Sequence, residues 1–300
     1  MEILKVEKIN KSFGDFCAVK DLSFNVNEKS MFGLLGPNGA GKTTTIRMIM
    51  DIIIPDSGTI SVENSTNGTA SDNIGYLPEE RGLYRKMKVF DLLLFLAELK
   101  SMKRKSAKQE IDKWLEKLGL NEWKNKKIEE LSKGMQQKIQ FIATVLHRPR
   151  LLILDEPFMG LDPINTNLVK DIMLELKDEG ASIIFSTHLM ENAEKLCDEI
   201  LLINKGESIL SGKLRTVKEN FGRKNILIEY EGNNSFLKDS DLIKNYDDYG
   251  NYAEIQLKEN ADSQKLLKET IEKVSIRKFE IVEPSLNEIF IETVNKTKIG

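Results

Sequence analysis

The sequence Gly36-Pro37-Asn38-Gly39-Ala40-Gly41-Lys42-Thr43 decides how the rest of the chain is interpreted. Glycines at this spacing let the backbone turn tightly and bring several N–H groups close to phosphate oxygens. The lysine that follows reaches the β and γ oxygens of a nucleotide, and the next hydroxyl binds Mg²⁺. An apolar run at 31–35 predicts a buried strand entering the loop, and a helix at 44–50 predicts a positive N-terminal end beside it. We expect phosphate contacts from Gly36, Asn38, Gly39, Gly41, Lys42, Thr43 and Thr44.

Composition limits the class of protein. The 300 residues are 40% apolar, which is enough for one large domain and a smaller module. The formal charge is −3, from 44 basic and 47 acidic residues, so we expect no nucleic-acid partner. Cys17 and Cys197 are the only cysteines, and no signal-peptide pattern is visible, which predicts a reducing cytoplasm and two buried or half-buried thiols. Apolar stretches fall short of the about 20 residues of a membrane-spanning helix, so a membrane part would be another chain.

The apolar pattern predicts an α/β core in the first two thirds of the chain. Alternation over residues 1–30 predicts antiparallel strands around a turn at Gly14-Asp15. Residues 89–120 follow a helical pattern. The short apolar runs at 151–154 and 182–185, separated by a helical stretch at 165–179, are typical of buried parallel strands.

A second, α+β module is predicted beyond Gly212. Strand patterns occur at 226–230, 253–257 and 276–282, with a helical pattern at 262–274. A further helix after Pro284 begins with a capping box, Ser285 and Glu288. The polar stretch 232–250 is expected to be a mobile loop.

Two carboxylates, Asp155 and Glu156, follow the apolar run at 151–154. Ligands bind at the carboxyl ends of the strands in α/β sheets, so both are expected at the phosphate-binding loop. There Asp155 would hold Mg²⁺ through water, and Glu156 would polarise the water that attacks the γ-phosphate. The combination predicts a site that hydrolyses a nucleoside triphosphate.

Four further features make residues 1–212 resemble the ATP-binding cassette (ABC) ATPases, the nucleotide-binding subunits of ABC transporters. Leu131-Ser132-Lys133-Gly134-Met135-Gln136 stands where that family has its signature motif, and Gly160-Leu161-Asp162 is similar to its D-loop. His188 resembles the switch histidine, and Phe13 resembles the aromatic residue that stacks on adenine. Each residue also has a structural interpretation: Ser132 and His188 as caps, Asp162 as a turn residue, and Phe13 as core.

The resemblance implies a RecA-like P-loop core with an antiparallel β subdomain, a helical subdomain at about 84–150, and an accessory α+β domain at 213–300. It implies hydrolysis of ATP to ADP and phosphate with Mg²⁺, using Lys42, Glu156 and His188 as catalytic residues and Thr43 and Asp155 at the metal. A second copy, or a paralogous cassette, would present Ser132, Gly134 and Asp162 to the ATP of the first. Separate transmembrane permease subunits would hold the protein at the cytoplasmic face of the membrane.

Two departures from the family pattern affect these expectations. Lys133 and Met135 replace a glycine and a glutamine of the signature motif. Glu79 stands where the family carries a glutamine that senses Mg²⁺ and contacts the permease, and as a carboxylate it remains an oxygen ligand for the metal. The alternative interpretation makes Glu79 a surface turn residue. Both departures, with the ending at 285–294, resemble the single-cassette subunits of bacterial ABC-2-type exporters.

Three other functions are compatible with parts of the pattern. A soluble cassette protein of ribosomes or nucleic acid would carry tandem cassettes, a long coiled coil or a basic face. A nucleotide switch on a non-membrane assembly would not need Lys42, Asp155, Glu156 and His188 together. A monomeric P-loop kinase would leave the signature motif without a use.

Overall fold

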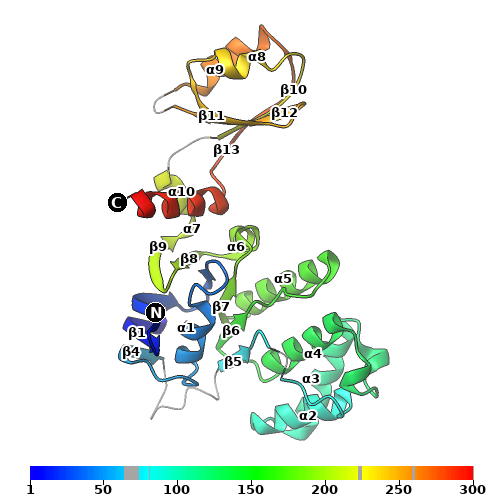
Figure 1. The fold of residues 1–300 in the computed structure, drawn as a ribbon. Helices are drawn as coiled ribbons and strands as arrows, with labels where there is room; N and C mark the ends of the chain where they lie inside the picture. The colour runs from blue at the N-terminus through cyan, green and yellow to red at the C-terminus, as the bar shows by residue number, and fades with distance from the viewer. Residues whose placement is uncertain (64–73, 81, 222–224, 259–260, 300) are drawn as a thin grey trace. The chain divides into compact units, whose positions relative to one another are not determined.

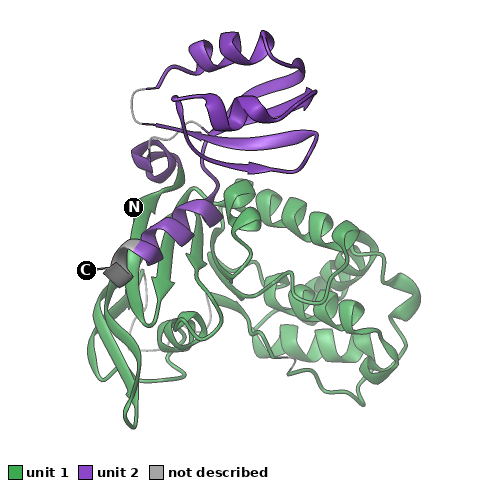
Figure 2. Cartoon of the chain, turned by 45° about the horizontal axis from the view of Figure 1, so that its top comes forward, with its two compact units in different colours: residues 1–214 green, residues 215–300 purple. Residues whose placement is uncertain are grey.

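The computed structural model of the chain describes residues 1–63, 74–80, 82–221, 225–258 and 261–299. The chain divides into two compact units, Met1–Leu214 and Arg215–Gly300, which are coloured separately in Figure 2. The nucleotide motifs and both carboxylates of the expected active site lie in the first unit.

A six-stranded sheet forms the centre of the first unit, and Figure 1 shows its strands in colours from blue to yellow-green. In spatial order the strands are β5 (Ile74–Leu77), β6 (Leu151–Asp155), β7 (Ser182–Thr187), β3 (Met31–Leu35), β8 (Glu199–Asn204) and β9 (Glu207–Lys213). All neighbouring pairs are parallel except β8 and β9. β3, β6 and β7 are buried along their whole length, which explains their continuous apolar sequences. The expected parallel pairing of the runs at 151–154 and 182–185 is confirmed.

A separate antiparallel sheet contains β2 (Phe16–Asn27), β1 (Glu2–Phe13) and β4 (Ser57–Val62). β1 and β2 form a hairpin that turns at Gly14-Asp15, as the alternation predicted. Cys197 is buried as expected, but the prediction for Cys17 was wrong because this thiol is exposed. Cys17 lies next to the hairpin turn, beyond the buried part of β2.

The helices of the first unit connect these strands. They are α1 (Lys42–Ile49), α2 (Val89–Leu99), α3 (Arg104–Lys117), the 3₁₀ helices η1 (Asn121–Trp123) and η2 (Ile128–Glu130), α4 (Lys133–Val145), α5 (Pro163–Asp178) and α6 (Met190–Leu196). The predicted helical pattern at 89–120 is confirmed and contains two helices, α2 and α3. Ser101, between α2 and α3, has φ 59°, a left-handed conformation that ends the first helix.

The second unit contains a four-stranded antiparallel sheet with α8 and α9 together on one side of it (Figure 1). Its strands, in spatial order, are β11 (Ile243–Asp248), β12 (Tyr252–Leu257), β10 (Asn225–Glu231) and β13 (Ser275–Val282). The helices are α7 (Leu214–Phe221, which begins at the unit boundary), α8 (Ser235–Asp239), α9 (Ser263–Ile271) and α10 (Leu286–Ile299). The capping box at the start of α10 is confirmed, since the Ser285 N–H donates to Glu288 at 2.7 Å and the Glu288 N–H donates back at 3.2 Å.

The prediction of a mobile loop at 232–250 was wrong. The stretch contains α8 and β11, and β11 pairs with β12 at the edge of the sheet. Phe236 and Leu237 are buried in the core of the unit, and the Tyr230 hydroxyl donates to Asp248 at 2.8 Å. Burial of Phe236 and Leu237, together with the hydrogen bond to Asp248, therefore gives a defined structure to a segment whose composition is mostly polar.

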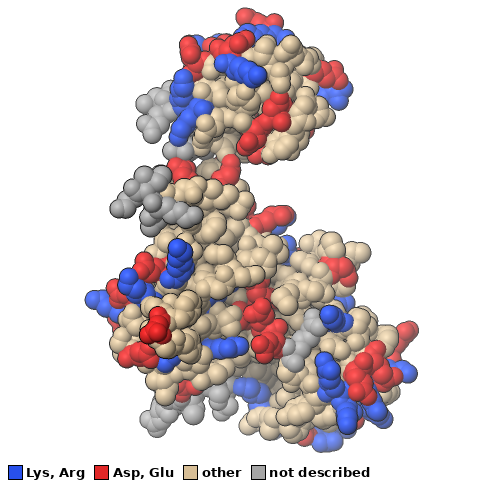
Figure 3. All heavy atoms as spheres, viewed as in Figure 1, with Lys and Arg blue, Asp and Glu red and all other residues tan. Residues whose placement is uncertain are grey.

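The surface bears mixed charge. On the face shown in Figure 3, basic and acidic side chains are interspersed over both units. In the described part of the chain, no helix combines the length and the apolar character required to cross a membrane.

Candidate nucleotide-binding site

The glycine-rich loop lies between β3 and the first turn of α1 and encloses a hollow of about 270 Å³. Gly41 has φ 108°, and a Cβ on it would lie 2.5 Å from the Ala18 carbonyl oxygen, so only glycine fits there. Eleven residues line the hollow: Phe16, Ala18, Asn38, Gly39, Ala40, Gly41, Lys42, Thr43, Thr44, Glu79 and Glu156. The structure thus brings most of the predicted phosphate-binding residues into one concave site.

Lys42 is buried at the base of this hollow. Its Nζ donates to the carbonyl oxygens of Gly36 at 2.8 Å and Pro37 at 3.1 Å. The same Nζ lies 3.8 Å from Oε1 of Glu156. Burial lowers the pKa of Lys42, while the charges of Glu156, Asp155 and Glu79 oppose that shift. An ammonium in this position can exchange its carbonyl partners for phosphate oxygens.

Asp155 ends β6 and is fully buried beside the hollow. Burial raises its pKa, and hydrogen bonds from Ser186 and Thr43 act in the opposite direction. Its second oxygen, Oδ2, has no hydrogen-bond partner in the described part of the chain, which is unusual for a buried carboxylate. A buried carboxylate with one unpaired oxygen suits a Mg²⁺ ion that takes its remaining ligands from phosphates and water. The described residues contain no group of three or more His, Cys, Asp or Glu placed to hold a metal.

Glu156 and His188 form a contact pair at the rim. Oε1 of Glu156 accepts a hydrogen bond from the His188 backbone N–H at 3.1 Å and lies 2.8 Å from the imidazole Nδ1. Glu156 itself has φ 49°, and its N–H donates to the Ser186 hydroxyl at 3.0 Å. Because β6 and β7 are neighbours in the sheet, Glu156 just after β6 contacts His188 just after β7, although the two residues are far apart in sequence.

Ser186 is a site residue that the sequence analysis missed. Its hydroxyl donates to Oδ1 of Asp155 while accepting from the N–H of Glu156, so it orients both carboxylates. The available signal was its position two residues before His188 at a strand end.

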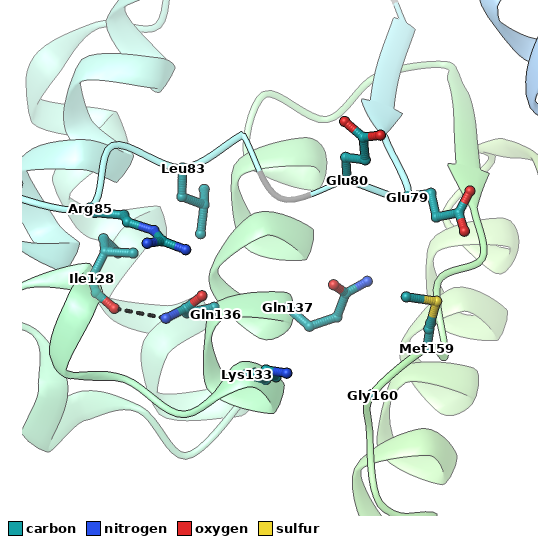
Figure 4. Close-up of a pocket in the computed structure, with 10 residues that line it drawn as sticks. All are labelled: Glu79, Glu80, Leu83, Arg85, Ile128, Lys133, Gln136, Gln137, Met159 and Gly160. Atoms are coloured by element: carbon teal, nitrogen blue, oxygen red, sulfur yellow. Dashed lines mark hydrogen bonds between the residues drawn. The ribbon is translucent and has the colours of Figure 1, made fainter.

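Glu79 follows β5 and lines two hollows. It borders the phosphate-loop hollow, and it also borders a neighbouring hollow of about 650 Å³ between its own loop, the start of α4 and Gly160 (Figure 4). Lys133 and Met159 are among the other residues of that second hollow. Glu79 is therefore placed where the nucleotide site meets the helical part of the unit.

The signature and D-loop segments lie together, away from the phosphate loop. The Ser132 hydroxyl caps α4 by accepting from the Met135 N–H at 3.3 Å, and a Cβ on Gly134 would lie 3.4 Å from the Gly160 carbonyl oxygen. Asp162 caps α5 by accepting from the Asn165 N–H at 2.9 Å, and this bond is the main cause of its lowered pKa. None of Ser132, Gly134 and Asp162 lines the phosphate-loop hollow of the same chain.

The aromatic residue that lines the phosphate-loop hollow is Phe16 and not Phe13. Phe13 is 49% exposed, so its interpretation as a core residue was wrong, and it is not among the residues that line the hollow. Phe16 lines it and is 63% exposed. The two are register partners across the β1–β2 turn, so their rings project from the same face of the hairpin. Both are candidates to contact a base.

The fold and these motifs define a class of protein: the chain belongs to the ATP-binding proteins of ABC transporters. Residues 19–159 match the family model described as ABC transporter, and residues 212–294 match the C-terminal domain of DrrA1-3-like ATP-binding proteins. It is thus an ATPase subunit of a membrane transporter, and its substrate is ATP.

Individual relatives share nearly the whole length. The ABC transporter ATP-binding protein YhaQ of Bacillus subtilis (strain 168) is 47% identical over 97% of this chain and 98% of its own. The linearmycin resistance ATP-binding protein LnrL of the same organism is 33% identical over 98% of this chain and 99% of its own. A solved ATP-binding subunit of an ABC transporter superimposes with a TM-score of 0.69 at 30% identity, covering 73% of this chain and 93% of that one.

Proposed function

We propose that two copies of this chain, or one copy and a paralogous cassette, close on two ATP molecules and drive separate permease subunits of an exporter. The protein would then work at the cytoplasmic face of the membrane. The observation that carries the proposal is the joining of Lys42, Glu156 and His188 at a hollow bordered by Glu79. A relative named for linearmycin resistance supports outward transport, because resistance can follow when a compound is carried out of the cell.

Hydrolysis would be carried out by residues whose contacts are already arranged. Lys42 would leave the carbonyls of Gly36 and Pro37 and neutralise the β and γ oxygens of ATP. Among the described residues, the contacts at the Glu156 carboxylate all go to Oε1, so Oε2 is the oxygen left to accept a proton from the attacking water. His188 would hold that carboxylate in place. A Mg²⁺ ion held by Thr43 and Asp155 would supply positive charge at the phosphates.

The permease would dock at a groove beside the Glu79 loop. This groove, of about 320 Å³, is mostly apolar, and its lining includes Met50, Tyr76, Leu83, Leu96, Leu99 and Ala143. Leu99 is 63% exposed at the end of α2, an arrangement typical of an apolar side chain that a partner covers. Leu83 belongs to the segment after Glu79, so a partner seated there would touch the loop that borders the nucleotide site.

Reconstitution with the polytopic membrane protein encoded beside its gene tests this proposal. We expect the membrane protein to stimulate ATP hydrolysis, and Leu99→Arg to abolish the stimulation while leaving basal hydrolysis intact. Leu174→Arg is the matched control, since Leu174 is also an exposed leucine of this unit but lies on α5, outside the groove. Equal stimulation of both variants would move the docking site elsewhere. Absence of any stimulation would favour a soluble ATPase or a nucleotide switch on a non-membrane assembly.

A further inference from the structure

Gln140 of α4 contacts the loop that carries Glu79. It is only 5% exposed, and its Nε2 lies 3.4 Å from the Pro78 carbonyl oxygen and 3.3 Å from the Glu80 carbonyl oxygen. A side-chain amide nitrogen has two N–H donors, so each carbonyl can take one of them, and both bonds are long. The two acceptors stand on either side of Glu79 in the sequence. One side chain of α4 therefore holds the backbone on both sides of Glu79.

The helix is fixed against the strand that leads into this loop. A Cβ on Gly75 of β5 would lie 2.5 Å from the Thr144 carbonyl oxygen of α4, so the two backbones touch directly. The Thr144 hydroxyl also lies 3.3 Å from the carbonyl oxygen of Tyr76. Because α4 and β5 meet at this point, the distance from Gln140 to the Glu79 loop is set by backbone packing.

The orientation of the Gln140 amide follows from its surroundings. With the amide turned over, Oε1 would face two carbonyl oxygens, which repel it, so Nε2 must point at the loop. The other end, Oε1, is buried and has no hydrogen-bond partner in the described ranges. Burying an amide with one end unpaired is unfavourable, and an apolar side chain of this length would avoid that loss. Packing alone thus does not account for a glutamine here.

We propose that Gln140 is a positioning residue for Glu79: by holding the Pro78 and Glu80 carbonyls, it sets where the Glu79 carboxylate lies beside the nucleotide hollow. Gln140 stands two turns beyond Ser132, the cap of α4. It therefore links the segment expected to meet the second cassette with the residue that borders both hollows. The catalytic consequence rests on the proposed function of Glu79, whereas the clamp itself rests only on the contacts of α4.

The catalytic test uses the full-length protein and Gln140→Met, which keeps the length of the side chain and removes both N–H donors. The Mg²⁺ concentration giving half-maximal ATP hydrolysis is measured for this variant in the parent and in a Glu79→Ala background. In the parent background we expect this Mg²⁺ concentration to change by about threefold to tenfold, the factor that corresponds to the usual net free energy of one or two hydrogen bonds. In the Glu79→Ala background we expect no further shift, because Gln140 acts through Glu79.

Gln136→Met is the matched control. Gln136 lies on the same helix, and its Nε2 donates to the carbonyl oxygens of Ile128 at 3.1 Å and Leu131 at 3.0 Å, not to the Glu79 loop. Any effect of Gln136→Met should therefore add to that of Glu79→Ala. If Gln140→Met does not fold, Gln140→Leu replaces it in the same comparison.

Hydrogen exchange tests the clamp without reference to catalysis. In the peptide that contains Glu79, Gln140→Met should accelerate amide exchange and Gln136→Met should not. If Glu79→Ala leaves the Mg²⁺ curve unchanged while Gln140→Met accelerates exchange, Gln140 does hold the loop, and the proposed role of Glu79 at the Mg²⁺ site is wrong. The proposal is overturned if the exchange is unchanged, or if the Mg²⁺ shift of Gln140→Met adds fully to that of Glu79→Ala.

Discussion

Asp155 and Glu156 are adjacent carboxylates with different surroundings. Asp155 is buried at the end of β6, where Ser186 holds one oxygen and the other is unpaired among the described residues. Glu156 turns away through a left-handed backbone conformation and lies close to both His188 and Lys42. One residue thus suits a metal and the next suits a water molecule. The difference comes from the backbone turn between them.

The first prediction concerns the carboxylate of Glu156. Glu156→Gln keeps the size and the contact to His188 but removes the proton acceptor, so steady-state phosphate release should fall by about 10²- to 10⁴-fold. ATP binding, measured by calorimetry, should be retained. Glu179→Gln, at the exposed C-terminal end of α5, is the control and should hydrolyse ATP at the parent rate. Turnover of Glu156→Gln within a factor of two of the parent would exclude Glu156 as the base.

The second prediction separates Phe13 from Phe16. Replacing the ring that stacks on the base with alanine should weaken ATP binding by about 1–3 kcal/mol, the usual value of base stacking on an aromatic ring. Because Phe16 lines the hollow, we expect Phe16→Ala to weaken binding, and Phe13→Ala to do so only if its ring also contacts the base. Calorimetry with ATP and with inorganic triphosphate distinguishes base contacts from phosphate contacts. Equal ATP affinity of both variants and the parent would place the base away from this hairpin.

At the scale of elements, α4 connects three parts of the first unit. Its capped end carries Ser132 and packs near Gly160, Gln137 reaches the Pro157 carbonyl oxygen at 3.5 Å, and Gln140 reaches the Glu79 loop. A displacement of this one helix would therefore affect both the segment after Glu156, through Pro157, and the loop that carries Glu79. Such contacts are a physical route for coupling between the subunit interface and the nucleotide site.

The third prediction concerns the capped end of α4. Ser132→Arg places a large side chain on a surface expected to meet the ATP of the second cassette, so dimer formation and hydrolysis should both be lost. Nucleotide binding by the monomer should be unaffected, since Ser132 does not line the hollow of its own chain. In a Glu156→Gln background, a binding assay measures the nucleotide affinity of the monomer, and sedimentation with ATP measures dimer formation. Weaker binding by the monomer would instead place Ser132 in the pocket of the same chain.

At the scale of the whole molecule, the two units have separate cores. The buried apolar residues of the second unit form their own cluster around Ile228, Tyr230 and Ile255. Its sheet is joined by antiparallel strand pairs only, whereas four of the five strand pairs in the central sheet of the first unit are parallel. The residues predicted to carry the nucleotide chemistry all lie in the first unit.

The fourth prediction concerns assembly. With ATP and Mg²⁺, the Glu156→Gln protein should sediment as a dimer, because the closed form cannot hydrolyse the ATP that bridges it. With ADP it should sediment as a monomer. Lys42→Ala is the control: it loses the ammonium that neutralises the phosphates and should remain a monomer with either nucleotide. A Glu156→Gln protein that stays monomeric at saturating ATP would contradict the two-cassette arrangement.

The phosphate-binding loop, the parallel strands and the two adjacent carboxylates were predictable because each depends on the spacing of nearby residues. The turn at Gly14-Asp15 and the capping box at Ser285 are local in the same sense. Polar composition was a poorer guide at 232–250, where burial of Phe236 and Leu237 orders the segment. Local sequence therefore determined most of the elements of the first unit and the motifs they carry, but not the helix and strand within 232–250.

Only the tertiary structure decided which residues meet. Ser186 reaches Asp155 and Glu156, and Gln140 reaches the loop of Glu79, across separations of 30 to 62 residues in the sequence. The order of strands in the sheet places β7 beside β6, and the close approach of α4 to Gly75 places a glutamine beside Glu79. The spacing of residues along the chain does not encode these distances, because they result from the packing of elements that fold from distant segments.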